Sequence, residues 1–154
     1  MMGGDYGDKD MDDMDLGKEL DRVGRFVRRN FSSALMSDTK WRKMFVALDT
    51  ANIGLEQVVV KFVEVEKVHR LRIPTKADLH PPWPWVDTLE FGPIELRAIE
   101  WLEFPRTAEW PRRNGVPDLH VAQDIQAARA IIEALGLYPV EAIGASLRIN
   151  GYAR

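Results

Sequence analysis

The stretch IELRAIEWLEF, residues 94–104, has the clearest strand pattern in the chain. In a strand, successive side chains point to opposite faces, so the even-numbered residues of this stretch share one face. That face is apolar except at one glutamate, and it holds Ile94, Leu96, Ala98, Glu100, Leu102 and Phe104. The other face carries Glu95, Arg97, Ile99, Trp101 and Glu103. The stretch is therefore predicted to form one half-buried strand that ends at Pro105.

Glu100 is the residue that this pattern singles out, because the strand period directs its carboxylate toward the core. A buried carboxylate has to be ion-paired, strongly hydrogen-bonded or protonated. The structural interpretation is a buried ion pair with Arg148 or Arg129. The functional interpretation is a general acid or base with a raised pKa. We favour the structural interpretation, and a β-bulge near Glu100 would instead reverse the strand phase and expose the side chain.

Two amphipathic helices are predicted before this strand. The first begins at Asp15 and keeps apolar residues at steps of three and four as far as Leu35. It is predicted to face the core, although a basic amphipathic helix can also lie on a membrane. The second, shorter helix is capped by one of residues 37–39 and stopped by Asn52 or Gly54.

Strands and a third helix follow along the chain. A valine-rich run at 58–65 predicts a strand, and residues 68–73 predict either its continuation or a second strand. The third helix is predicted to be capped by Asp118 and ended by Gly136. Residues 146–150 alternate between polar and apolar and predict a last strand.

The remaining segments are predicted to be irregular. Prolines exclude regular structure from residues 74–88, residues 89–91 pair at most briefly, and residues 92–93 make a turn. Residues 105–117 are predicted to form a long loop. Long loops of this kind are where a binding function most often lies.

Together these elements predict an α+β fold in which a small antiparallel sheet packs with about three helices. Residues 1–14 are rich in aspartate and glycine, so we expect them to be an acidic, disordered tail. Residues 15–154 are predicted to form a single α+β domain, in keeping with a chain of 154 residues.

The composition of the chain argues against several kinds of site, location and partner. The chain has no cysteine, which excludes disulfides, thiolate metal sites and a cysteine nucleophile. No secretory signal and no membrane-spanning run is visible, so we expect a cytoplasmic protein that does not bind a membrane. A net charge of −3 argues against nucleic-acid binding, which relies on a basic surface.

Catalytic and metal-binding signatures are absent from the sequence. The histidines His69, His80 and His120 do not have the spacing of metal ligands, and His120 is expected near the start of the third helix. Asp78 and His80 could form an acid–base pair, as could any two such residues on a loop. Phosphate-binding glycine loops and the serine hydrolase motif are also missing. We expect no metal and no cofactor, and we prefer a non-catalytic role while leaving the question of an enzyme open.

Tryptophans are frequent, and three of the five lie in predicted loops beside prolines. Such residues either cover the core or anchor a partner, because tryptophan is enriched at binding hot spots; we prefer the covering role. Acidic residues nearby, at Asp78, Asp87 and Glu90, would suit a cationic protein partner. The candidate binding residues are Trp83, Trp85, Asp87 and Trp110.

Four short motifs follow one another along the chain: TKWRKMF at 39–45, FGPI at 91–94, IEWLEFP at 99–105 and RINGY at 148–152. Together they resemble a family of small bacterial proteins known only as a domain of unknown function. The similarity covers residues 38–154, so the tail and the first helix lie outside it. The resemblance implies a single intracellular bacterial domain, and it transfers no catalytic residue because no activity is established for that family.

The leading functional hypothesis is a non-catalytic protein-binding module, of the immunity or antitoxin kind that neutralises a partner. It rests on small size, acidity, the lack of an active-site motif and a loop rich in aromatic residues. The alternative from another class is a small hydrolase or nucleotide-modifying enzyme that uses Glu100 with a histidine. A third hypothesis is a self-associating structural protein, which would form a homo-oligomer.

Overall fold

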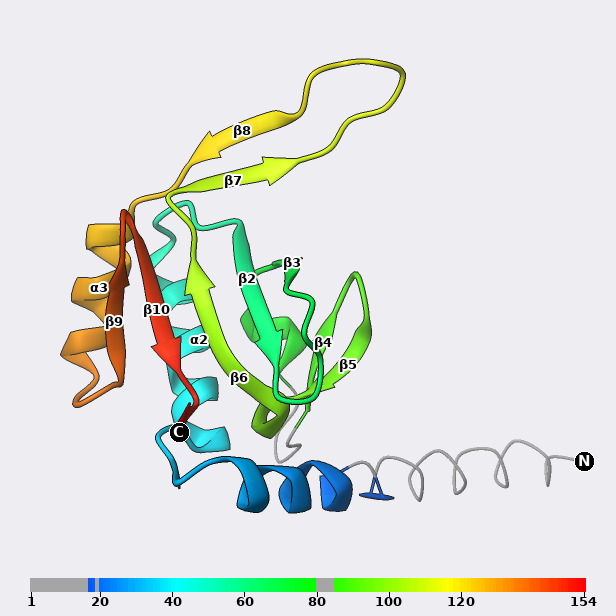
Figure 1. Cartoon of the computed structure of the whole chain (residues 1–154). Coiled ribbons are helices and arrows are strands. Elements are labelled where there is room, and N and C mark those ends of the chain that lie inside the picture. Colours follow the sequence, from blue (N-terminus) through cyan, green and yellow to red (C-terminus); the bar gives the residue numbers. More distant parts are fainter. Residues whose placement is uncertain (1–16, 19, 80–84) are drawn as a thin grey trace, which may run out of the picture.

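The computed structural model describes residues 17–18, 20–79 and 85–154 (Figure 1). It confirms the predicted α+β class, since three helices pack with a mainly antiparallel set of strands. The predicted acidic tail, residues 1–14, lies outside the described residues. So do two residues that the sequence singled out, His80 and Trp83.

The main sheet has five strands in the order β3-β2-β6-β10-β9, and every neighbouring pair is antiparallel. The open choice for residues 68–73 is settled, because they hold a second strand that pairs with the valine-rich one. The predicted last strand is confirmed as β10, and the sequence analysis missed β9 beside it. The strands are β2 (Gln57–Phe62), β3 (His69–Arg72), β6 (Ile99–Phe104), β9 (Val140–Ile143) and β10 (Ser146–Asn150).

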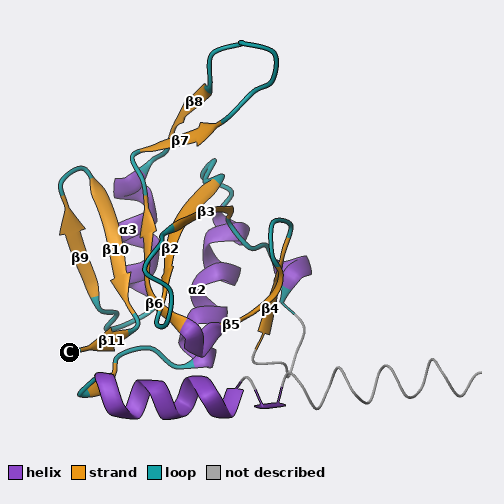
Figure 2. Cartoon of the chain, turned by 45° about the vertical axis from the view of Figure 1, so that its right-hand side comes forward, coloured by secondary structure: helices purple, strands orange, loops and turns teal. Residues whose placement is uncertain are grey.

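Two helices, α2 (Asp38–Ala51) and α3 (Ile125–Ala134), pack on one face of this sheet (Figure 2). The predicted caps of α2 are confirmed: the Ser37 side chain accepts from a backbone N–H, and Asn52 ends the helix in the left-handed conformation with φ of 50°. The main core lies between these layers. Its fully buried members include Trp41, Met44, Phe45, Val58, Val60, Leu102, Phe104, Ile132, Leu147 and Ile149.

The predicted start of the third helix at Asp118 is wrong. The helix begins after Asp124, whose side chain accepts from the N–H of Ala127 at 3.0 Å. Both aspartates precede apolar residues, so either could cap a helix. Val121, which fitted the helical spacing, belongs instead to a strand before the helix.

The first helix is shorter than predicted, because its described helical segment ends at residue 30. The chain then forms β1 (Ser33–Ala34), which pairs with β11 (Tyr152–Ala153) near the C-terminus. Leu35 is therefore exposed rather than part of the apolar stripe. A second, smaller core cluster lies here, formed by Val23, Phe31 and Val63 with Phe26, Val27, Ala98 and Tyr152 packed against it.

The stretch 94–104 is not one strand, as predicted, because a 3-10 turn, η2 (Leu96–Ala98), interrupts it. Its first part belongs to β5 (Gly92–Glu95), which pairs with β4 (Trp85–Thr88) in a separate hairpin. The turn of this hairpin lies at residues 89–91, so the predicted turn at 92–93 is displaced. The proline-rich region also contains one turn of 3-10 helix, η1 (Lys76–Asp78), and so it is less irregular than predicted.

The predicted loop at 105–117 is wrong as well, because a third hairpin begins there. Its strands are β7 (Thr107–Trp110) and β8 (Leu119–Ala122), joined by residues 111–118. We call residues 107–122 the arm, because this hairpin stands out from the rest of the protein (Figures 1 and 2). No helix among the described residues is long and apolar enough to cross a bilayer.

Candidate functional site

Glu100 lies at an irregularity between β2 and β6. Lys61 pairs with Trp101 while the next residue, Phe62, pairs with Ile99, so Glu100 has no opposite residue. Such a bulge turns two successive side chains to the same side of the strand. Ile99 accordingly belongs to the main core, and Glu100 shares with Trp101 the side away from it.

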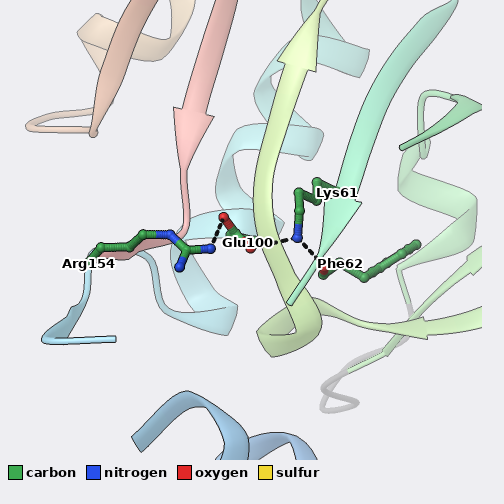
Figure 3. Close-up of polar contacts among 4 residues, drawn as sticks. All are labelled: Lys61, Phe62, Glu100 and Arg154. Carbon is green, nitrogen blue, oxygen red and sulfur yellow. Dashed lines mark hydrogen bonds and ion pairs between the residues drawn. The ribbon is translucent and has the colours of Figure 1, made fainter. Parts of the chain in front are cut away.

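The Glu100 carboxylate is nonetheless buried, with 8% of the residue exposed, because two cations cover it. The Lys61 ammonium donates to Oε1 at 2.8 Å, and the Arg154 guanidinium donates to Oε2 at 3.1 Å (Figure 3). Lys61 also donates to the Phe62 carbonyl at 3.1 Å. Each carboxylate oxygen of Glu100 thus accepts a hydrogen bond from a cation.

The partners predicted for Glu100 are wrong. Arg148 pairs with Glu103 at 3.2 Å, directly across β6 and β10, and its guanidinium lies 3.9 Å from the centroid of the Trp101 ring. Arg129 pairs with Glu133 one turn along α3. The bulge explains the difference, because it moves Glu100 toward β2 and the C-terminal residue.

No histidine of the described residues bonds to Glu100. His69, on β3, packs between the rings of Phe62 and Phe91 at centroid distances of 6.0 and 4.9 Å. His120 lies exposed on β8 rather than near the start of a helix. The part of the chain that the structure describes also contains no group of three or more histidine, aspartate or glutamate side chains that could hold a metal ion.

The candidate binding residues that the structure describes lie on two different hairpins. Trp85 and Asp87 lie on β4, where Trp85 lines a pocket of about 270 Å³ together with Phe62 and Ile94. Trp110 lies on the arm, in a different hairpin. Trp83 falls outside the described residues.

Two of the acids that suggested a cationic partner, Asp78 and Glu90, bond within the protein. Asp78 accepts from the backbone N–H of Thr75 at 2.8 Å and from its hydroxyl at 3.1 Å. Glu90 accepts from the N–H of Arg72 at 3.1 Å. Two of the three acids in this region thus have hydrogen bonds within the protein.

Trp110 braces the arm against the sheet. Its indole N–H donates to the Glu56 carboxylate at 3.1 Å, and the Arg72 guanidinium lies 4.6 Å from the centroid of its ring. The neighbouring Glu109 pairs with Arg70 at 3.6 Å. Side chains at the ends of β2 and β3 therefore fix the base of the arm on one side.

The side-chain amide of Gln57 binds the backbone of β7 as the peptide group of a neighbouring strand would. Its side chain is 1% exposed, its Nε2 donates to the Glu109 carbonyl at 2.9 Å, and its Oε1 accepts from the Glu109 N–H at 2.9 Å. Arg70 donates to the same Oε1 at 2.9 Å. One side-chain amide thus supplies the donor and acceptor pair of a peptide group.

Gln123 fills the place where β6 leaves the sheet to enter the arm. The register of β2 and β6 would bring Gln57 opposite Pro105, which has no N–H to offer. The Gln123 Oε1 accepts from the N–H groups of Glu56 and Gln57 at 2.8 and 2.9 Å. Its Nε2 donates to the carbonyls of Gln57 and Pro105 at 3.1 and 2.8 Å. All hydrogen-bonding positions of this buried amide are used.

We call Gln57 and Gln123 the glutamine clamp. The clamp holds the direction of the arm, since it joins β2 to residues on both sides of the departure point. The sequence analysis missed both residues. Gln57 precedes a valine run and Gln123 precedes a helix cap, and a single amide at such a position has no periodic pattern. Their role becomes visible only once the register of the strands is known.

The far end of the arm is exposed and cationic. Every residue from 111 to 120 is exposed, including the apolar side chains of Val116 (46%) and Leu119 (41%). Arg112 donates through Nε to the Pro117 carbonyl at 2.8 Å, which orders the connecting loop. Arg113 has no ion-pair partner among the described residues. The arm therefore contributes little to the core and offers a surface of its own.

A family model described as a family of unknown function (DUF6678) matches residues 23–154. The match includes most of the first helix, so the expectation that this helix lies outside the family is wrong. No curated protein matches the chain, and no solved structure matches it.

Proposed function

We infer that this chain, which belongs to the DUF6678 family of unknown function, is a non-catalytic protein-binding module whose docking element is the arm. The immunity or antitoxin kind of module, which neutralises a partner by occupying it, is the form of this activity that we propose. Such proteins need a rigid surface rather than a reactive centre.

The observation that carries the proposal is the contrast between the two ends of the arm. Its base is held by the glutamine clamp and by the Trp110 contacts, while the residues beyond Trp110 are exposed. A surface element whose direction is held in the free protein loses less conformational entropy on binding than a flexible loop. Among the described residues, the side chains that bond to the buried Glu100 carboxylate are two cations, and this supports a structural role for that carboxylate rather than catalysis.

Site-specific photo-crosslinking tests the docking role of the arm. Benzoylphenylalanine is introduced at Val116, on the exposed tip, and in a matched control at Leu137, which is 93% exposed on another part of the surface. After irradiation in cells of the native host, we expect the Val116 position to cross-link a distinct protein. An excess of unlabelled wild-type chain should suppress this product at least tenfold.

Three results would overturn the proposal. The first is the absence of a cross-linked protein from Val116, and the second is the same product from Val116 and Leu137. The third is a product that contains two copies of this chain, which would establish the self-associating protein instead.

A further inference from the structure

The hydrogen bonds of the arm alternate in direction along its two strands. The N–H of Gln123 donates to the carbonyl of Arg106 at 2.8 Å, which makes this a hydrogen-bonded pair. Ala122 lies one residue and His120 three residues before Gln123 along the chain. Both therefore belong to the non-hydrogen-bonded pairs of the arm. Their backbone N–H and C=O groups, like those of Glu109 opposite, point away from the other strand.

The two edges of the arm therefore differ. On β7, the outward groups of Glu109 are occupied by the Gln57 amide. On β8, no hydrogen bond from another described part of the chain reaches the backbone of His120 or Ala122, and both residues are exposed. An open strand edge is a template for a further strand.

The charge of the arm indicates which kind of added strand would bind at the edge of β8. Of the two carboxylates of the arm, Glu109 is paired with Arg70 and Asp118 lies in the connecting loop, while Glu56, at the base, accepts from Trp110. In the connecting loop the exposed guanidinium groups of Arg112 and Arg113 outnumber Asp118, and Arg106 is exposed next to the base. An acidic segment therefore complements the arm better than a basic one.

We propose that the outer edge of β8 binds an extended, acidic segment of a protein partner, which adds to the arm as a third strand. This inference rests on the proposed function and names the surface and the chemistry of its partner. A two-stranded ribbon also fits the major groove of DNA. Three cations neutralise few phosphates, however, and the net charge of the chain is −3, so we favour the protein segment.

A pair of synthetic peptides tests the chemistry. The first is fluorescein-labelled Glu-Val-Glu-Thr-Glu-Val-Glu-Thr, and the second has lysine in place of every glutamate. In anisotropy titrations with the full chain, we expect the acidic peptide to bind at least tenfold more tightly. In amide-exchange measurements it should slow exchange at His120 and Ala122 at least tenfold, and leave Glu109 unchanged because Gln57 already occupies that edge.

Two variants at one position test the edge. His120→Pro removes an outward N–H, which an edge strand tolerates, whereas His120→Ala keeps it. We expect His120→Pro to weaken binding of the acidic peptide at least tenfold and His120→Ala to bind as the wild type does. An unchanged indole resonance of Trp110 in both variants shows that the arm is still formed.

Several outcomes would overturn the inference. They are no binding of the acidic peptide, equal or tighter binding of the lysine peptide, equal binding by the two variants, and displacement of the peptide by duplex DNA. The proposed function fails separately. If Val116 cross-links a partner equally well in His120→Pro and His120→Ala, the docking arm stands and the β8 edge is wrong; if Val116 cross-links nothing, both are wrong.

Discussion

Glu100 receives a cation on each carboxylate oxygen, and this geometry determines what its replacement should do. Glu100→Gln keeps the shape of the side chain but leaves Lys61 with a side chain only 15% exposed and no counter-charge. Removing one partner of a buried pair leaves an uncompensated charge, which is strongly destabilising. We expect the free energy of unfolding to fall by about 1–3 kcal/mol in urea titrations, less than for a fully buried pair because Arg154 is largely exposed.

The matched control for this change is Glu133→Gln on α3. Glu133 also pairs with an arginine, but both side chains are about half exposed, and such pairs contribute under about 0.5 kcal/mol. A loss in Glu100→Gln no larger than the loss in Glu133→Gln would contradict the structural role of Glu100.

Residue-scale reasoning from the sequence identified Glu100 but not its surroundings. Periodicity marked the carboxylate as unusual, whereas the bulge that turns it toward Lys61 depends on pairing with a strand almost forty residues away. Gly151 shows the same limit. A Cβ at Gly151 would overlap the Ile99 carbonyl oxygen and lie 3.1 Å from that of Glu100, a restriction that no local pattern announces.

At the scale of elements, the glutamine clamp joins the base of the arm to β2. Gln123→Leu would leave the N–H groups of Glu56 and Gln57 and the carbonyls of Gln57 and Pro105 without their partner. Each buried group left unsatisfied costs about 1–3 kcal/mol. We expect the free energy of unfolding to fall by more than about 2 kcal/mol, and the arm to sample a wider range of directions.

Spin labels can measure that second effect, because the chain has no cysteine of its own. Labels on Asn114→Cys in the arm and Glu133→Cys on α3 report one distance across the protein. The distance distribution should broaden in Gln123→Leu. It should stay narrow in the control variant Gln126→Leu, which changes an exposed residue of α3. An unchanged distribution in Gln123→Leu would show that the clamp does not direct the arm.

Elements with strong local signals were predictable, and elements defined by pairing were not. The helix at 38–51 has a cap at Ser37 and a left-handed stop at Asn52, and both signals are local. The arm has prolines on both sides of its tip and strands of four residues, a pattern that also suits a loop. The interruption at 96–98 keeps the apolar alternation of a strand, so the 3-10 turn was hidden within it.

At the scale of the whole molecule, the segment that follows the first helix packs against the C-terminal residues. β1 pairs with β11, and the ring of Tyr152 stacks on Phe31 with centroids 5.1 Å apart. The Tyr152 hydroxyl donates to the carbonyl of Arg97, in the turn before β6. Tyr152 thus joins strand β11 to the residue after the first helix and to the turn that precedes β6.

These contacts of Tyr152 predict how stability responds to alkaline pH. Burial raises the pKa of Tyr152, Arg97 opposes the shift and Asp38 adds to it. The folded state therefore keeps the phenol proton to higher pH than the unfolded state, whose tyrosine ionises near pH 10. The stabilising contribution of Tyr152 is complete below about pH 10 and is lost as pH rises through its pKa in the folded protein.

Urea titrations from pH 7 to 11.5 should show a steeper alkaline loss of unfolding free energy in wild type than in Tyr152→Phe. Burial also raises the pKa of Tyr138, but this residue contributes equally to both proteins. Between pH 7 and 9 the difference between the two proteins should stay constant, which gives the baseline for the lost hydrogen bond. Parallel curves up to pH 11.5 would show that Tyr152 does not hold its proton in the folded state.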